Sequence, residues 1–169
     1  THPDQVFFIK VSDLLNARII TPEQLRVIHE RMLRDYFFGQ RDRTLRNIWV
    51  ASDAKIAYID NGDSLNLGKE LFKDKFLFED MFGRTSFDGD DGLPFFKSVD
   101  NIFYNDLASM WKGGKQQEVL TILKPEAEKI LRLTREDVLA IVDDPRIAQR
   151  IFDKQDELRA QFIMYGVPI

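Results

Sequence analysis

Three oxygen-bearing side chains, those of Asp42, Asn47 and Asp60, are spaced in a way that suits metal-assisted phosphoryl transfer. Asp42 stands five residues before Asn47, and Asp60 follows thirteen residues after Asn47, beyond two β-prone runs. Because the strands of a hairpin run out and return, this spacing is expected to gather the three side chains at one end of the hairpin. Phosphoryl transfer from ATP needs hard oxygen ligands for Mg²⁺ and a carboxylate that orients the attacking hydroxyl and takes its proton. The sequence therefore favours a phosphotransferase site here.

Local signals predict the elements that must position these residues. The run Thr21-Pro22-Glu23-Gln24 is a strong helix start, and apolar residues then recur at helical spacing until Gly39 ends the helix. Two β-prone runs follow, at residues 48–50 and 55–59, and the four residues between them are a length suited to a hairpin. The sequence Asp60-Asn61-Gly62 closes the second strand.

The chain from about Leu65 onward is predicted to be a series of helices. Thr134 caps one of them and Pro145 opens the last. The dense aromatic stretch from Phe72 to Trp111 is expected to pack in the core. Residues 1–169 are therefore expected to form a single domain that is mainly α with one small β-hairpin. The expected breaks between helices are Gly83, Gly89, Gly92-Leu93-Pro94, Gly113-Gly114 and Pro125.

The composition argues against several classes of function. The absence of cysteine excludes disulfides, thiolate catalysis, iron–sulfur clusters and cysteine-bound zinc, and it permits a reducing compartment such as the cytoplasm. The 24 basic and 28 acidic residues are spread along the chain, so no long basic tract is present to neutralise a nucleic-acid backbone, and nucleic acid is not an expected partner. No signal peptide is expected, because the amino-terminal run Thr1-His2-Pro3-Asp4-Gln5 has no basic segment followed by a long apolar run. No membrane span is expected either, because no stretch approaches ~18 apolar residues.

The candidate residues resemble motifs of a known family. The atypical branch of kinase-like enzymes includes the phosphatidylinositol 3/4-kinases, actin-fragmin kinase and HipA-type bacterial kinases, and its catalytic loop reads Gly-x-x-Asp-Arg-x-x-x-Asn. This chain has at the matching place Gly39-Gln40-Arg41-Asp42-Arg43-Thr44-Leu45-Arg46-Asn47. The family's metal-binding strand end, Ile-Asp-[Asn/His/Phe]-Gly, is similar to Tyr58-Ile59-Asp60-Asn61-Gly62. The close match covers about residues 35–65 and implies the helical carboxyl-terminal lobe of such an enzyme.

The resemblance also implies roles for individual residues. Asp42 would be the base or hydroxyl-positioning group, and Arg43 would hold the loop or meet a phosphate. Asn47 and Asp60 would bind the metal and, through it, the nucleotide. The implied cofactors are ATP and Mg²⁺, and the implied acceptor is a hydroxyl of a protein, lipid or small molecule.

The chain departs from the family in its amino-terminal part. A kinase has an amino-terminal lobe with a Gly-rich turn over the phosphates and a lysine paired to a glutamate, yet 41 residues precede Asp42 and none before Gly39 is a glycine. Lys10 could stand in for the strand lysine, or the residues around it could be a connecting segment. We therefore expect either the carboxyl lobe of a longer protein or one piece of a split enzyme, completed by an amino-terminal lobe or partner chain. A reduced fold that no longer catalyses is a third explanation.

A purely structural interpretation of the same residues stays open. Asp and Asn commonly cap turns, and Asp60-Asn61-Gly62 also suits an ordinary turn after a strand. In that case the chain would be a non-catalytic helical module for protein interaction, either a degenerate kinase lobe or an unrelated fold.

Overall fold

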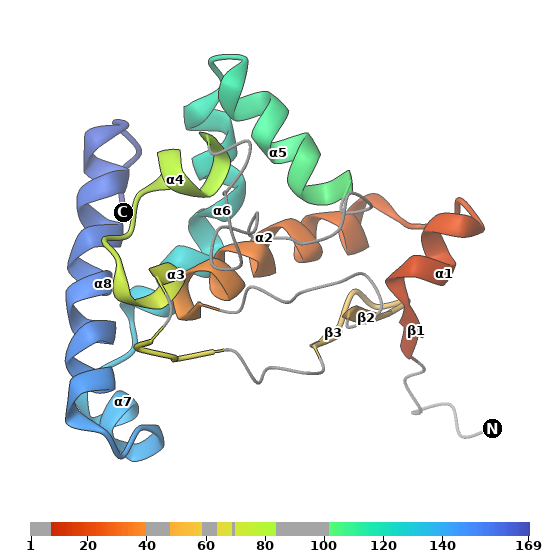
Figure 1. Ribbon diagram of the computed structural model, residues 1–169. Helices are drawn as coiled ribbons and strands as arrows, with labels where there is room; N and C mark the ends of the chain where they lie inside the picture. Colours follow the sequence, from red (N-terminus) through yellow and green to blue (C-terminus); the bar gives the residue numbers. More distant parts are fainter. Residues whose placement is uncertain (1–7, 40–47, 59–63, 69, 84–101) are drawn as a thin grey trace.

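The structure, a computed structural model, describes residues 8–39, 48–58, 64–68, 70–83 and 102–169 (Figure 1). Helices dominate it, so the predicted class, mainly α with a small β element, is confirmed. In chain order, the elements are β1 (Phe8–Lys10), α1 (Val11–Asn16), α2 (Pro22–Phe38), β2 (Ile48–Ala51), β3 (Ile56–Tyr58), α3 (Glu70–Lys73), α4 (Phe78–Gly83), α5 (Ile102–Lys112), α6 (Gln116–Leu131), α7 (Arg135–Ile141) and α8 (Pro145–Met164).

Helix α2 begins and ends where its sequence predicts. The Thr21 hydroxyl accepts a hydrogen bond from the Gln24 backbone N–H, and the Gln24 side chain accepts one from the Thr21 N–H. Pro22 occupies the first turn, where its missing N–H would have no helical partner in any case. At the other end, Gly39 adopts a left-handed conformation with φ 77°, and its N–H caps the helix by donating to the carbonyls of Asp35 and Tyr36. Both ends of α2 are therefore fixed by local interactions.

The sheet has three strands in the order β1-β2-β3, where the sequence predicted a two-stranded hairpin. The predicted hairpin is present, because β2 and β3 pair antiparallel with Val50 opposite Ile56. The additional strand β1 pairs antiparallel with β2, and Ile9 lies opposite Val50. β1 has only three residues, and pairing with a strand some forty residues later defines it, which no local periodicity can indicate.

Helix α2 is the central element of the fold. It packs against α6 and α5, while α8 packs against α6 and α7. The sheet and α1 lie toward the beginning of α2, and α3 and α8 lie toward its end (Figure 1). Buried side chains of α2 and β2, such as Ile28, Phe37 and Val50, belong to the same core cluster as Leu123 of α6 and Phe162 of α8. Helix α2 therefore connects the β element to the helical part of the core.

The aromatic stretch packs in the core, as predicted, wherever it is described. Phe72, Phe76, Phe78, Phe82 and Trp111 are all buried. Most of their rings meet edge to face or tilted, as Phe76 and Phe78 do at a centroid distance of 5.1 Å and an interplanar angle of 86°, while Phe78 and Phe82 are stacked; these are favourable aromatic arrangements. The rest of this prediction concerns the side chains of Phe95, Phe96 and Phe103, which lie outside the described part of the structure.

The predicted breaks between helices have mixed outcomes. Gly113-Gly114 separates α5 from α6, and Gly83 is the last residue of α4, as expected. Thr134 and Pro145 begin α7 and α8, also as expected. The prediction for Pro125 was wrong, because this proline lies inside α6. Buried residues on both sides of it hold α6 against α2, and this packing outweighs the missing backbone hydrogen bond. The breaks predicted at Gly89 and residues 92–94 lie outside the described residues.

Replacing Gly39 by alanine should destabilise the protein more than the same change at Gly114. Both glycines have a positive φ, 77° and 86°, so each alanine is strained by about 1–2 kcal/mol. A Cβ on Gly39 would in addition lie 2.7 Å from the Cβ of Phe72, whereas nothing lies within 4 Å of one on Gly114. Forcing atoms into a packed core adds roughly 1–3 kcal/mol, so Gly39→Ala should lower the free energy of unfolding by that much more than Gly114→Ala. Urea titration measures both losses, and equal losses would contradict the close contact.

Candidate functional site

The predicted site residues Asp42, Arg43, Asn47 and Asp60 lie outside the described residues. Their predicted roles therefore stay predictions. The residues that flank them are described, and these define where the two segments that carry the site are attached to the fold.

The first attachment lies at the open end of the hairpin. Ile48, which begins β2, is the direct pairing partner of Tyr58, which ends β3. The residues that precede Ile48 and the residues that follow Tyr58 therefore join the sheet side by side.

The second attachment lies at the end of α2. Gly39 leads out of the helix, and the backbone N–H of Leu65 donates a hydrogen bond of 2.8 Å to the carbonyl of Phe38. The chain that leaves β3 has therefore returned to the end of α2 by Leu65. Segments 40–47 and 59–64 are thus attached at the same two places, the end of α2 and the open end of the hairpin.

Helix α2 also fixes the other end of strand β2. The side chain of Gln24, buried in the first turn of α2, donates a hydrogen bond of 2.8 Å from its Nε2 to the carbonyl of Ala51. The same side chain accepts the capping hydrogen bond of the helix, so one residue orients both α2 and the hairpin. The sequence predicted the capping role of Gln24, but it contains no local signal for the contact with Ala51.

Lys10, the residue that could stand in for a strand lysine, lies at the end of strand β1. This favours the strand interpretation of its surroundings over the connecting segment. Its ammonium lies 5.2 Å from the centre of the Trp49 ring, a cation–π distance. Whether Lys10 meets a nucleotide stays a prediction.

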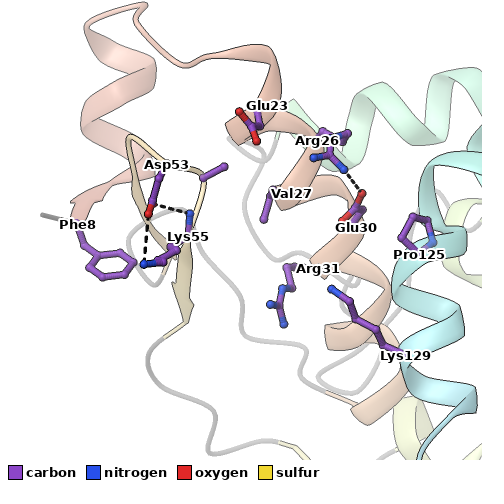
Figure 2. Close-up of a pocket in the computed structure, with 11 residues that line it drawn as sticks. Phe8, Glu23, Arg26, Val27, Glu30, Arg31, Asp53, Lys55, Pro125 and Lys129 are labelled. Atoms are coloured by element: carbon purple, nitrogen blue, oxygen red, sulfur yellow. Dashed lines mark hydrogen bonds and ion pairs between the residues drawn. The ribbon is translucent and has the colours of Figure 1, made fainter. Parts of the chain in front are cut away.

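A groove of about 600 Å³ lies at the turn of the hairpin, between β1, α2 and α6 (Figure 2). Its charged side chains are largely paired with one another. Asp53 accepts a hydrogen bond of 3.1 Å from the backbone N–H of Lys55, which lowers the pKa of its carboxyl, and it pairs with the ammonium of Lys55 at 3.3 Å. Arg26 pairs with Glu30 at 2.8 Å. The turn is the opposite end of the hairpin from Ile48 and Tyr58, so this groove is not where the predicted site is attached.

A buried carboxylate lies beside this groove, between α2 and α6. Glu126 is 0% exposed, and its Oε1 accepts a hydrogen bond of 2.5 Å from Nε of Arg34. The ammonium of Lys129 is 3.8 Å from the other oxygen, and Arg31 is 4.0 Å from the first. Three cations therefore surround one buried anion, which compensates the cost of removing it from water. The cluster contains no nucleophile beside a general base, so we interpret it as structural.

Removing Arg34 should destabilise the protein more than neutralising Glu126. Arg34→Met leaves the buried carboxylate without its hydrogen bond, which should cost roughly 2–4 kcal/mol, because Lys129 and Arg31 compensate only part of the charge. Glu126→Gln keeps an acceptor oxygen, and Arg34 is 40% exposed and can be hydrated, so its cost should stay below about 1.5 kcal/mol. Chemical denaturation of both variants tests this order. A larger loss for Glu126→Gln would show that the contact is not a buried anion held by an exposed cation.

Within the described part of the chain, no group of three or more His, Asp or Glu side chains could hold a metal ion. The predicted metal ligands Asn47 and Asp60 are not in that part. None of the described helices has the length and apolar character needed to cross a membrane. Comparison with protein-family models, curated proteins and solved structures found no match to this chain.

Proposed function

We propose that this chain is the catalytic lobe of an ATP- and Mg²⁺-dependent phosphotransferase that acts on a hydroxyl group. The observation that supports this most directly is the shared attachment of segments 40–47 and 59–64. Both connect the end of α2 to the paired residues Ile48 and Tyr58. Two short segments between the same two places keep their residues within reach of one another, as a shared metal site requires.

The donor set in these segments fits Mg²⁺. Asp60 would supply a carboxylate and Asn47 an amide oxygen, and such hard oxygen ligands are those that Mg²⁺ takes beside the phosphates of ATP. The bound ion would neutralise charge that develops on the phosphates. Arg43 would add a further positive charge for a phosphate or hold the loop in place.

Asp42 would act on the acceptor. Its carboxylate would orient the hydroxyl and receive its proton as the acceptor oxygen bonds to the γ-phosphorus. The bond between that phosphorus and the oxygen bridging to the β-phosphate breaks in the same step, with ADP as the leaving group. We further propose that a Gly-rich turn and a lysine over the phosphates come from an amino-terminal lobe, in the same protein or in a partner chain. Protein, lipid and small-molecule hydroxyls all fit this chemistry.

Nucleotide binding tests this proposal. The protein, alone or together with the proposed amino-terminal lobe, should bind a fluorescent ATP analogue when Mg²⁺ is present. It should release the analogue when the ion is chelated. Asp60→Ala should weaken binding by about 10-fold or more, because it removes a metal ligand. Asp53→Ala is the matched control, since Asp53 lies on the same hairpin at the opposite end and pairs with Lys55. A wild-type protein that binds no nucleotide in either form, or an Asp53→Ala loss equal to that of Asp60→Ala, would refute the proposal.

A second variant separates binding from chemistry. Asp42→Asn removes the proton acceptor but no metal ligand, so it should keep nucleotide binding and lower the rate of phosphoryl transfer by roughly 10²–10⁴-fold. The rate of ADP release, measured with and without candidate acceptors, gives this comparison. Unchanged turnover in Asp42→Asn would show that Asp42 is not the base.

A non-catalytic interaction module is the second candidate function. It is supported by large apolar side chains that face solvent on α7 and at the end of α8, since such side chains occur at protein contacts. Ile141 is 77% exposed and Ile163 is 69% exposed. A chain that binds a defined partner protein but never nucleotide would favour this function.

A further inference from the structure

Segment 72–78 comprises the end of α3, the connection 74–77 and the first residue of α4, and it relies on side chains of α8 for several of its backbone hydrogen bonds. The Nε of Arg150 donates a hydrogen bond of 3.0 Å to the carbonyl of Phe72, and its Nη2 donates one to the carbonyl of Asp74. Glu157 accepts from the N–H of Phe76 at 2.7 Å. Backbone groups removed from water need such partners, and residues 74–77, between α3 and α4, belong to no helix or strand that could supply them.

The same stripe of α8 continues one turn further. Gln161 accepts a hydrogen bond of 3.0 Å from the N–H of Phe78, and Arg150 is itself held by Glu157 through hydrogen bonds of 2.9 and 3.0 Å. Residues 150, 157 and 161 share one face of the helix because their spacings are close to whole turns. Segment 72–78 is therefore docked along α8 by polar contacts, while its phenylalanine side chains enter the core.

A lysine lies in the middle of this docking face. Lys154 is 1% exposed, and its ammonium lies 5.1 Å from the ring centre of Phe72, 5.4 Å from that of Phe37 and 6.0 Å from that of Phe76. Phe72 and Phe76 belong to the docked segment. If the segment left α8, two of these three rings would leave as well, and the ammonium would meet water.

Burial changes the protonation of this lysine. Loss of hydration and, to a smaller extent, the charge of Arg150 lower the pKa of Lys154 to about 7, although the charges of Glu157 and Asp74 act in the opposite direction. The charges that act on the ammonium are those of Arg150 and Glu157 on α8 and of Asp74 in the segment, and α2 contributes the Phe37 ring. The pKa of a lysine in water is roughly 10.4, so its side chain there stays protonated well above neutral pH.

We infer that segment 72–78 is a proton-linked latch, whose separation from α8 exposes Lys154 to water and is favoured when Lys154 is protonated. The closed state favours the neutral amine and the open state favours the ammonium. Above neutral pH each opening must therefore bind a proton, so opening becomes rarer as the pH rises. Below neutral pH both states carry the proton, and opening no longer depends on pH through this group.

The latch reaches the proposed site through a close contact. Phe72 lies against Gly39, the last described residue before segment 40–47. That this contact would regulate phosphoryl transfer rests on the proposed function. The latch itself does not, because its opening can be measured without nucleotide.

Amide hydrogen exchange in the whole chain tests the latch. The amides of Phe76 and Phe78 report its opening directly, because their hydrogen bonds end on α8. After correction for intrinsic exchange, their protection should rise by roughly 10- to 30-fold between pH 6 and pH 8.5. The protection of core amides of α6, such as that of Leu123, should rise much less, because opening of the latch does not expose them.

Two variants identify the group that binds the proton. Lys154→Met should remove the dependence of protection on pH, whereas Lys75→Met, at an exposed lysine of the same segment, should retain it. Glu157→Gln keeps an acceptor for the N–H of Phe76 but removes a negative charge that favours protonation of Lys154. The rise in amide protection should therefore begin at a lower pH in this variant than in the wild type. This variant tests the linkage even if Lys154→Met does not fold.

Three outcomes would overturn the latch. The first is an equal pH dependence in Lys154→Met and the wild type. The second is an equal rise for Leu123, which would mean that the whole fold opens rather than the segment. The third is a Glu157→Gln profile that begins to rise at a higher pH. Failure to bind ATP would refute the proposed function and leave all three measurements unaffected.

Discussion

Gly39 and Phe72 come so close that a side chain larger than hydrogen at position 39 would overlap the phenylalanine. This contact sets where α2 can end and where the chain can leave it. While segment 72–78 is docked on α8, Phe72 cannot retreat from Gly39, because Arg150 of α8 holds its carbonyl and the core surrounds its ring. A glycine is required on both counts, since the left-handed turn that caps α2 also disfavours a Cβ. The exit of the chain toward segment 40–47 is therefore fixed by packing as well as by the helix cap.

Helix α2 then relates the two ends of the candidate site to each other. Near its beginning, Gln24 holds the carbonyl of Ala51, and at its end the carbonyl of Phe38 holds the N–H of Leu65. Each hydrogen bond contributes only about 1 kcal/mol, but a buried group left without a partner costs more, so both contacts restrict the geometry more than they add stability. A rigid helix with a fixed hairpin at one end and a fixed chain return at the other is a suitable support for a loop that must place a carboxylate near a metal.

Local signals predicted the parts of this arrangement that are themselves local. The capping residues Thr21 and Thr134 and the opening Pro145 were correct because a cap depends on residues within one turn. Strand β1 and the course of α6 through Pro125 were missed because distant partners determine both. A signal for Lys154 was present, since it replaces an apolar residue in the stripe Ile147, Ile151, Leu158 and Phe162 of α8, but only the packing of segment 72–78 gives it meaning. The proposed chemical site depends on Asp42, Asn47 and Asp60, which lie outside the described residues, and their spacing and the flanking attachments support the proposal.

The two buried charges show why the α2 side and the α8 side of the fold should respond differently to a change of conditions. Around Glu126, all the partners are side chains of α2 and α6, so that ion cluster joins two long helices that also share much of the core. Around Lys154, part of the surroundings belongs to a short connecting segment whose backbone depends on α8. Moving a long helix would open a large apolar area, whereas moving the segment would open a smaller one, mainly the rings of three phenylalanines. Segment 72–78 is held by fewer apolar contacts than the long helices, so the proposed change in protonation would expose Lys154 and not Glu126.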